Sequence, residues 1–139
     1  MTEKEMISAL TEIIDDAKTA ILATIDHDSK PQVRWVSPCL LLSQPGSIFM
    51  LTSPTFSKIK QISKNPSVQW MFQSRALDKI LTVNARIAIC DNVALQSELL
   101  EKLSPRLRTF WNMNSDKHSM IALESVIADA TLFFPVKNK

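Results

Sequence analysis

The stretch of sequence that decides the fold is residues 20–42, AILATIDHDSKPQVRWVSPCLLL. Its first part, residues 20–25, is almost wholly apolar and rich in β-branched side chains, which is typical of a buried strand. The polar run at residues 26–31 ends in proline and indicates a turn. From Gln32 to Leu42 the side chains then alternate with period two. The stretch therefore predicts two strands joined by a short turn.

The alternation in the second strand separates its side chains onto two faces. One face carries Val33, Trp35 and Ser37, and the other carries Arg34, Val36 and Pro38. Arg34 is unusual because a charge among apolar neighbours is costly to bury without a partner. Two interpretations remain open for it: a salt bridge or an exterior position, or a role in binding an anion.

The elements around this hairpin follow from local patterns. Thr2 and Glu5 have capping-box spacing and begin a helix that runs to about Lys18. No long helix separates the first three strands, so the short turns predict a mainly β (α+β) antiparallel sheet that closes into a small barrel. The other expected elements are a strand at 47–52, a helix at 58–64, strands at 67–72 and 80–90, a helical stretch at 94–103, a helix beginning at Ser104-Pro105, and a closing strand or pair of strands at 120–136.

Length and glycine content limit the kind of site that is possible. A chain of 139 residues suits one domain, residues 1–139. Its one glycine is Gly46, whereas average usage would give about ten. Glycine-rich phosphate loops need several positions of close backbone approach, so both the dinucleotide and the Walker types are excluded. A phosphate ligand would have to be held by side chains and a helix end.

Charge, hydropathy and cysteine content limit which classes of partner and which compartment are expected. A net charge of +2, from 16 basic and 14 acidic residues, is too weak to predict nucleic acid or an anionic membrane surface as a partner. The longest aliphatic run, Leu40–Leu42, is far too short to span a bilayer. The first six residues carry acids and no apolar core, unlike a secretory signal. We therefore expect a cytoplasmic protein in which Cys39 and Cys90 are reduced, buried and inert.

Two further segments could carry chemistry. Thr52–Lys58 places several hydroxyls and a lysine where a strand leads into a helix, and a helix N-terminus favours an anion. Simple capping by Thr55 or Ser57 would explain the hydroxyls equally well. Lys79–Arg86 contains polar residues within the fifth strand, which could form only its solvent face.

Taken together, four short motifs resemble a known superfamily over residues 20–92. They are Arg34-Trp35-Val36-Ser37, Leu51-Thr52, Ser57-Lys58 and Asn65-Pro66, in that order and spacing. The pattern resembles the flavin-binding split-barrel superfamily of pyridoxamine 5′-phosphate oxidase-like proteins, especially its small general stress protein branch. The resemblance implies a six-stranded antiparallel split barrel with flanking helices, forming a homodimer that holds FMN in clefts between its subunits.

The resemblance also assigns roles to residues. Arg34 and Lys58 would grip the phosphate, and Thr52, at the end of the Leu51-Thr52 pair, would add a hydroxyl with Ser57. The backbone would line the flavin ring edge at Trp35, Val36 and Ser37. Lys79 lies near the position of a glutamine that contacts the isoalloxazine in the oxidases, where a cation would stabilise the reduced anionic flavin.

Two departures from the family pattern matter for function. Ser57 stands where the oxidases usually have arginine, which weakens one phosphate contact. The chain ends Leu132-Phe133-Phe134-Pro135-Val136, with no Arg-x-His-like segment for a pyridoxal substrate. A true pyridoxamine 5′-phosphate oxidase is therefore disfavoured.

The leading hypothesis is an FMN-binding protein that acts as a flavin-dependent oxidoreductase. One alternative is a non-catalytic module that binds or stores flavin or haem. A distant alternative is a small barrel that binds single-stranded nucleic acid, which would need interleaved aromatic and basic residues. His27 and His118 have no ligand-spaced partners, so no metal site is expected. Trp111 could cover the flavin, although packing explains it more simply.

Overall fold

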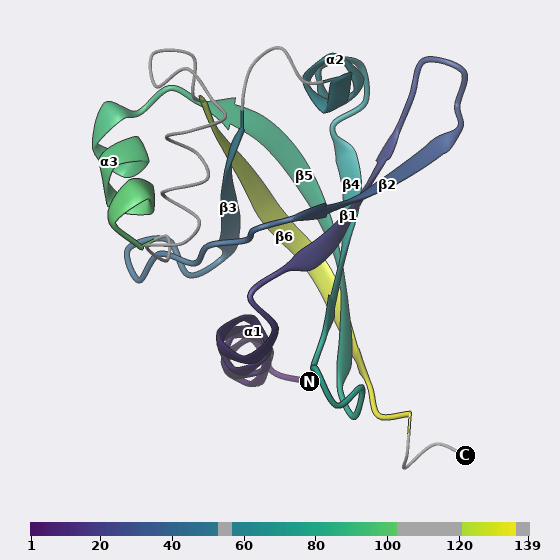
Figure 1. The fold of residues 1–139 in the computed structure, drawn as a ribbon, viewed down its shortest axis with the longest axis vertical. Coiled ribbons are helices and arrows are strands. Elements are labelled where there is room, and N and C mark those ends of the chain that lie inside the picture. The colour runs from purple at the N-terminus through teal and green to yellow at the C-terminus, as the bar shows by residue number, and fades with distance from the viewer. Residues whose placement is uncertain (53–56, 103–120, 136–139) are drawn as a thin grey trace.

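The computed structural model describes residues 1–52, 57–102 and 121–135. These residues form three helices and six strands, drawn in Figure 1. In chain order the elements are α1 (Glu3–Ala17), β1 (Ala20–Ile25), β2 (Pro31–Val36), β3 (Ser47–Thr52), α2 (Ser57–Lys64), β4 (Ser67–Gln73), β5 (Ile80–Cys90), α3 (Val93–Lys102) and β6 (Ile121–Phe133).

The strands form one antiparallel sheet in the order β2-β1-β4-β5-β6-β3. The sheet curls until its two edges approach each other. Cys39, just after β2, exchanges backbone hydrogen bonds of 2.7 and 2.8 Å with Phe49 of β3. The mainly β, antiparallel split-barrel fold with flanking helices is thereby confirmed.

The strand expected at 32–42 is shorter than its alternation suggested. The ladder with β1 ends at Val36, and beyond it the described backbone forms only the bridge at Cys39. Pro38 lies between them and has no N–H to donate, which explains the interruption. At the other end of the chain, the expected strand or pair is one strand, β6, with a register shift opposite Asn84 and Ala85. The helix expected from Ser104-Pro105 lies outside the described residues.

Apolar side chains pack in two clusters on either side of β3. The larger cluster fills the inside of the curl, where the rings of Trp70 and Phe72 stack with centroids 5.5 Å apart. The Trp70 indole N–H donates to Ser125 Oγ at 3.0 Å, so this buried donor is satisfied. The smaller cluster includes Phe49 of β3 and Leu99 of α3, both fully buried. Because both faces of β3 are covered, every residue in this strand is buried.

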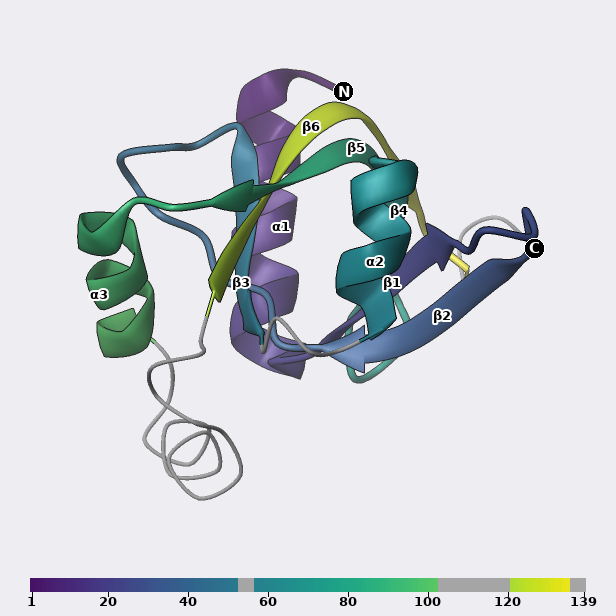
Figure 2. The same ribbon diagram turned by 90° about the horizontal axis from the view of Figure 1, so that it is seen from above.

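The three helices sit at different places around the sheet. Helix α1 begins with the predicted capping box of Thr2 and Glu5, and its C-cap is Lys18 in the left-handed conformation. In Figure 1, α1 lies near the lower end of the sheet and α2 near its upper end, and Figure 2 shows α3 to the side of β3. In the described part of the chain, no helix is long and apolar enough to cross a membrane.

Candidate anion-binding site

Arg34 faces the inside of the curl from the edge strand β2. The predicted alternation is confirmed here, because Val33 and Trp35 are 70% and 76% exposed while Arg34 and Val36 are half-buried. Arg34 is paired in register with Leu22 of β1, whose neighbour across the sheet is Trp70 of β4. The guanidinium is therefore carried inward by the same pleat that turns Trp35 outward.

The guanidinium of Arg34 is held by two neutral side chains. Its Nη1 donates to Thr24 Oγ1 at 2.9 Å, and its Nη2 donates to Gln61 Oε1 at 3.0 Å. The Thr24 hydroxyl in turn donates to the same Gln61 oxygen at 2.5 Å. Thr24 is fully buried on β1, and Gln61 is half-buried on α2. Three elements thus fix the orientation of this one side chain.

The positive charge of Arg34 has no acidic partner within the described residues. The ion pairs found there are His27 with Asp28 and Lys79 with Glu12, and neither involves Arg34. Burial lowers the pKa of Arg34 from its ordinary value. An arginine nevertheless stays charged at neutral pH. The site therefore offers a fixed, partly desolvated cation with N–H groups to spare.

Helix α2 brings the second pair of predicted residues close to Arg34. Ile62 is buried in the main core and Ile59 packs against it, which fixes the helix on the sheet. Gln61, which contacts Arg34, lies one helical turn after Ser57 and Lys58, the first two residues of α2. The side chains of Ser57 and Lys58 are outside the described part of the structure. Their backbone positions place them at the helix N-terminus, where N–H groups and the dipole favour an anion.

Thr52, the last residue of β3, has an unusual hydroxyl. The residue is 1% exposed, and its Oγ1 is a buried polar atom with no hydrogen-bond partner in the described structure. Buried hydroxyls are normally satisfied, so an unpaired one needs an explanation such as a bound ligand. Four residues separate Thr52 from Ser57, so their Cα atoms lie within about 18 Å. The neighbouring Leu51 differs, since its side chain packs in the smaller apolar cluster.

Lys79 lies apart from the other predicted residues within one protomer. It is in the β4–β5 turn, at the end of the sheet opposite α2 (Figure 1). Its Nζ donates to Glu12 Oε1 of α1 at 2.5 Å, and this contact raises the pKa of Lys79. The structure thus brings Arg34 and α2 together but places Lys79 elsewhere.

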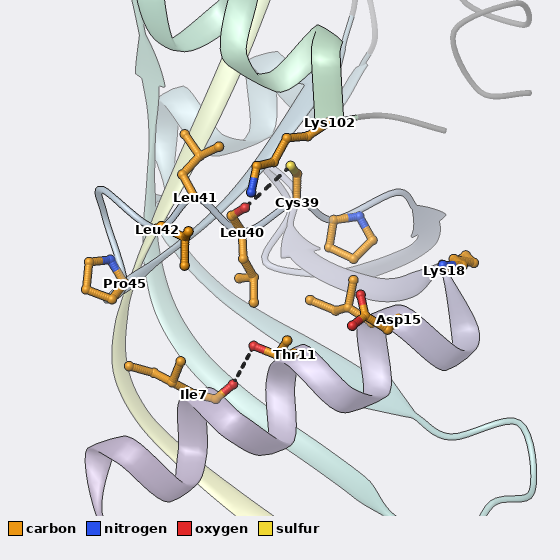
Figure 3. A pocket seen from close by; sticks show the side chains of 12 residues that line it. Ile7, Thr11, Asp15, Lys18, Cys39, Leu40, Leu41, Leu42, Pro45 and Lys102 are labelled. Atoms are coloured by element: carbon orange, nitrogen blue, oxygen red, sulfur yellow. Dashed lines mark hydrogen bonds between the residues drawn. The ribbon is translucent and has the colours of Figure 1, made fainter. Parts of the chain in front are cut away.

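A cavity of about 340 Å³ lies between α1 and the segment after β2. Figure 3 shows Leu40 pointing from that segment toward α1, with Lys102 of α3 above it. The cavity walls are mostly apolar, and none of the predicted site residues is among its described lining residues. Lys18 and Lys102 each stand at a helix C-terminus, where they offset the helix dipole. Arg34, and not this cavity, is therefore the candidate anion site.

Potential metal ligands do not cluster in the described ranges, which contain no group of three or more histidine, cysteine, aspartate or glutamate side chains close enough to hold an ion. His27 is exposed in the β1–β2 turn, and His118 and Trp111 lie outside the described residues. Cys39 and Cys90 are free cysteines; Cys39 is buried as expected, whereas Cys90 is only half-buried. Burial raises the pKa of the Cys39 thiol.

Comparison with known proteins identifies the family. The model of the pyridoxamine 5′-phosphate oxidase family matches residues 6–129. The chain belongs to this family. A search of curated proteins gives no match. The sequence-based family assignment is confirmed, including its likeness to general stress protein 26 relatives.

Several solved structures share the fold of this chain at low sequence identity. General Stress Protein 26 from Bacillus anthracis is 22% identical, with a TM-score of 0.73 over 96% of this chain and 95% of that one. An FMN-binding, pyridoxamine 5′-phosphate oxidase-related protein from Nostoc punctiforme is 13% identical, with a TM-score of 0.74 over 91% and 83%. HutZ, the haem storage protein from Vibrio cholerae, is 18% identical, with a TM-score of 0.70 over 91% and 92%.

The sequence analysis did not single out Thr24 and Gln61, the two partners of Arg34. Thr24 carried a weak signal, because it is a polar residue within the apolar strand of residues 20–25. Gln61 gave no such signal, since glutamine is common on the exposed faces of helices. Only the packing of α2 across β1 shows that it faces inward.

Proposed function

We propose that this family member binds FMN, with the phosphate at Arg34 and the N-terminus of α2. Arg34 and Lys58 would supply positive charge, and Ser57 and Thr52 would donate hydroxyl hydrogen bonds. The backbone at Trp35–Ser37 and at Leu51 would line the flavin ring.

The observation that carries this proposal is the half-buried Arg34 with neutral partners only. A partly desolvated cation that lacks a carboxylate is suited to a charged ligand, because the ligand restores the missing charge. The buried, unpaired Thr52 hydroxyl is a second polar group that a phosphate or flavin oxygen would satisfy. Membership of a family with an FMN-binding member among its similar structures gives independent support.

We also propose a homodimer with FMN between the subunits. Val33 and Trp35 expose large apolar surfaces next to each other on β2, which suits a protein interface. Only a second protomer would bring Lys79 to the flavin, since within one protomer it lies at the opposite end of the sheet from α2. In that position it would stabilise the reduced anionic flavin.

The reaction we propose is flavin-dependent oxidation or reduction of a small molecule. FMN would carry the electrons, and this chain would bind and tune it. No residue is assigned a proton-transfer role. The free cysteines fit a reducing compartment, and we propose the cytoplasm.

The test is a visible spectrum of the purified protein together with thermal melts in the presence of FMN. We expect flavin absorbance, or a melting temperature that rises with FMN concentration as a ligand specific for the folded state requires. Colourless protein whose melting temperature does not respond to FMN contradicts the proposal. Oxidation of a nicotinamide donor by the FMN-loaded protein then separates an enzyme from a storage module.

Haem binding is the second candidate function, favoured by the likeness to a haem storage protein. It predicts a haem spectrum on reconstitution with haemin and no response to FMN. His27 is too exposed to be a strong axial ligand, since its side chain is 72% exposed in the turn. We therefore rank FMN first.

A further inference from the structure

Gln61 of α2 contacts the guanidinium of Arg34 without neutralising its charge. Arginine is a donor only, so the Gln61 atom that faces it is the amide oxygen, Oε1. That oxygen accepts one bond from Arg34 and one from the Thr24 hydroxyl, which fills both of its lone pairs. The three side chains of Thr24, Gln61 and Arg34 are thus hydrogen-bonded to one another, while the charge of Arg34 is left uncompensated among them.

The choice of an amide at position 61 has a consequence for ligand binding. A glutamate has the same shape and would accept the same two hydrogen bonds, but it would also neutralise the guanidinium. Thr24 is likewise neutral and fully buried, so neither partner of Arg34 competes with an incoming anion for the charge. The other N–H groups of the fork have no partner among the described residues.

We propose that Gln61 and Thr24 are positioning residues that make the site selective for a flavin bearing a phosphate over riboflavin, which has none. They hold the guanidinium with its free N–H groups available, and they leave its charge for a phosphate monoester at the start of α2. This inference rests on the proposed FMN binding.

The decisive experiment measures FMN and riboflavin affinities for the wild-type protein and for Gln61→Glu. We expect Gln61→Glu to weaken FMN binding about 10- to 100-fold, in line with the loss of one charge-assisted contact. Riboflavin affinity should change by less than about threefold. The melting temperature of the ligand-free variant should be equal or higher, because the new carboxylate pairs with a half-buried cation.

The matched control is Gln44→Glu, which makes the same change in net charge at an exposed turn residue. It should leave both affinities unchanged. Thr24→Val removes one hydrogen bond to Arg34 without adding charge, and Thr24→Ser restores the hydroxyl. We expect Thr24→Val to reduce FMN affinity and Thr24→Ser to recover it, which keeps the inference testable should Gln61→Glu not fold.

The outcomes separate this inference from the proposed function. If the wild-type protein binds neither flavin, the proposed function fails. If it binds FMN but Gln61→Glu leaves the FMN-to-riboflavin ratio unchanged, or lowers both affinities equally, the positioning role is overturned. An equal loss of FMN binding in Gln44→Glu also overturns it, because the effect is then one of overall charge.

Discussion

Arg34 and Lys79 are two basic side chains at different ends of one sheet, and their surroundings differ in kind. Arg34 lies beside α2 with a threonine and a glutamine as partners. Lys79 lies beside α1 with Glu12 as its partner, and its neighbour Asp78 raises its pKa further. One charge is therefore left uncompensated by the described residues, and the other is already balanced.

The difference shows that the position of a basic residue in the sequence does not reveal whether its charge is available. Both residues fit the family pattern on spacing alone. Only the packing of helices against the sheet decides which acid or amide each one meets. A half-buried cation without an acidic partner favours an anionic ligand much more strongly than a half-buried cation that is already paired with a carboxylate.

The largest expected effect comes from removing the charges at the α2 end. The double variant Arg34→Ala/Lys58→Ala should raise the FMN dissociation constant at least about 100-fold, because each charge-assisted bond contributes about 1.5–3 kcal/mol. Isothermal titration with FMN and with riboflavin measures the loss, which should be confined to FMN. The control is Arg75→Ala, an exposed basic residue in the β4–β5 turn at the other end of the sheet. Equal losses in the two variants would mean that the effect is one of overall charge and not of the α2 end.

A smaller effect is expected from the hydroxyl of Thr52. Thr52→Val keeps the shape but removes the buried, unpaired oxygen. FMN affinity should fall by about 3- to 10-fold, the value of one hydrogen bond. The ligand-free protein should be as stable as the wild type or more so, since an unsatisfied buried group costs about 1–3 kcal/mol. Urea unfolding checks the second point, and a loss of stability above about 1 kcal/mol would mean that the hydroxyl already has a partner.

Most of the fold could be predicted from local patterns in the sequence. Alternation placed Arg34 and Trp35 on opposite faces without deciding which face is inward, and the strand at residues 80–90 was placed at the bounds that the structure has. Alternation in that strand predicts one apolar face, on which the structure buries all but the last residue: Leu81, Val83, Ala85 and Ile87 are buried, and Ile89 is 44% exposed. The register shift between β5 and β6 lies between Asn84 and Ala85, with the extra residue in β6, and a sequence read strand by strand gives no sign of it.

The candidate site could be predicted less well than the fold, for a physical reason. Its predicted members come from separate elements, and what decides their use is contact between those elements. Gln61 reaches Arg34 because Ile62 fixes α2 on the core, and Glu12 reaches Lys79 because α1 lies beside the β4–β5 turn. Such long-range pairings depend on helix docking, which neither periodicity nor motif spacing encodes.

The proposed place of Lys79 beside the flavin can be tested through the reduction potential. If a second protomer brings it to the flavin, Lys79→Met should lower the reduction potential of bound FMN, because a cation beside the ring stabilises the reduced anion. FMN affinity should change by less than about threefold. Glu12→Gln releases the same cation from its partner and should raise the potential instead. A potential that neither variant moves would leave Lys79 with a role in holding α1 only.

The smallest expected effect is a pH dependence that belongs to Lys79 alone. Contact with Glu12 raises the pKa of Lys79 above its ordinary value of 10.5 in the folded protein. The folded state thus binds this proton more tightly than the unfolded chain does. The stabilisation from this contact is complete at pH values below the ordinary pKa of lysine, and it is lost as the pH rises through the raised pKa of Lys79 in the folded protein. Urea unfolding at pH 8 and near pH 11 should show the wild type losing more stability than Glu12→Gln over that interval. Arginine stays charged over this pH interval, so the difference between wild type and Glu12→Gln should be the same when both also carry Gln61→Glu. If the difference vanished in the Gln61→Glu background, the two ends of the sheet would be electrostatically coupled.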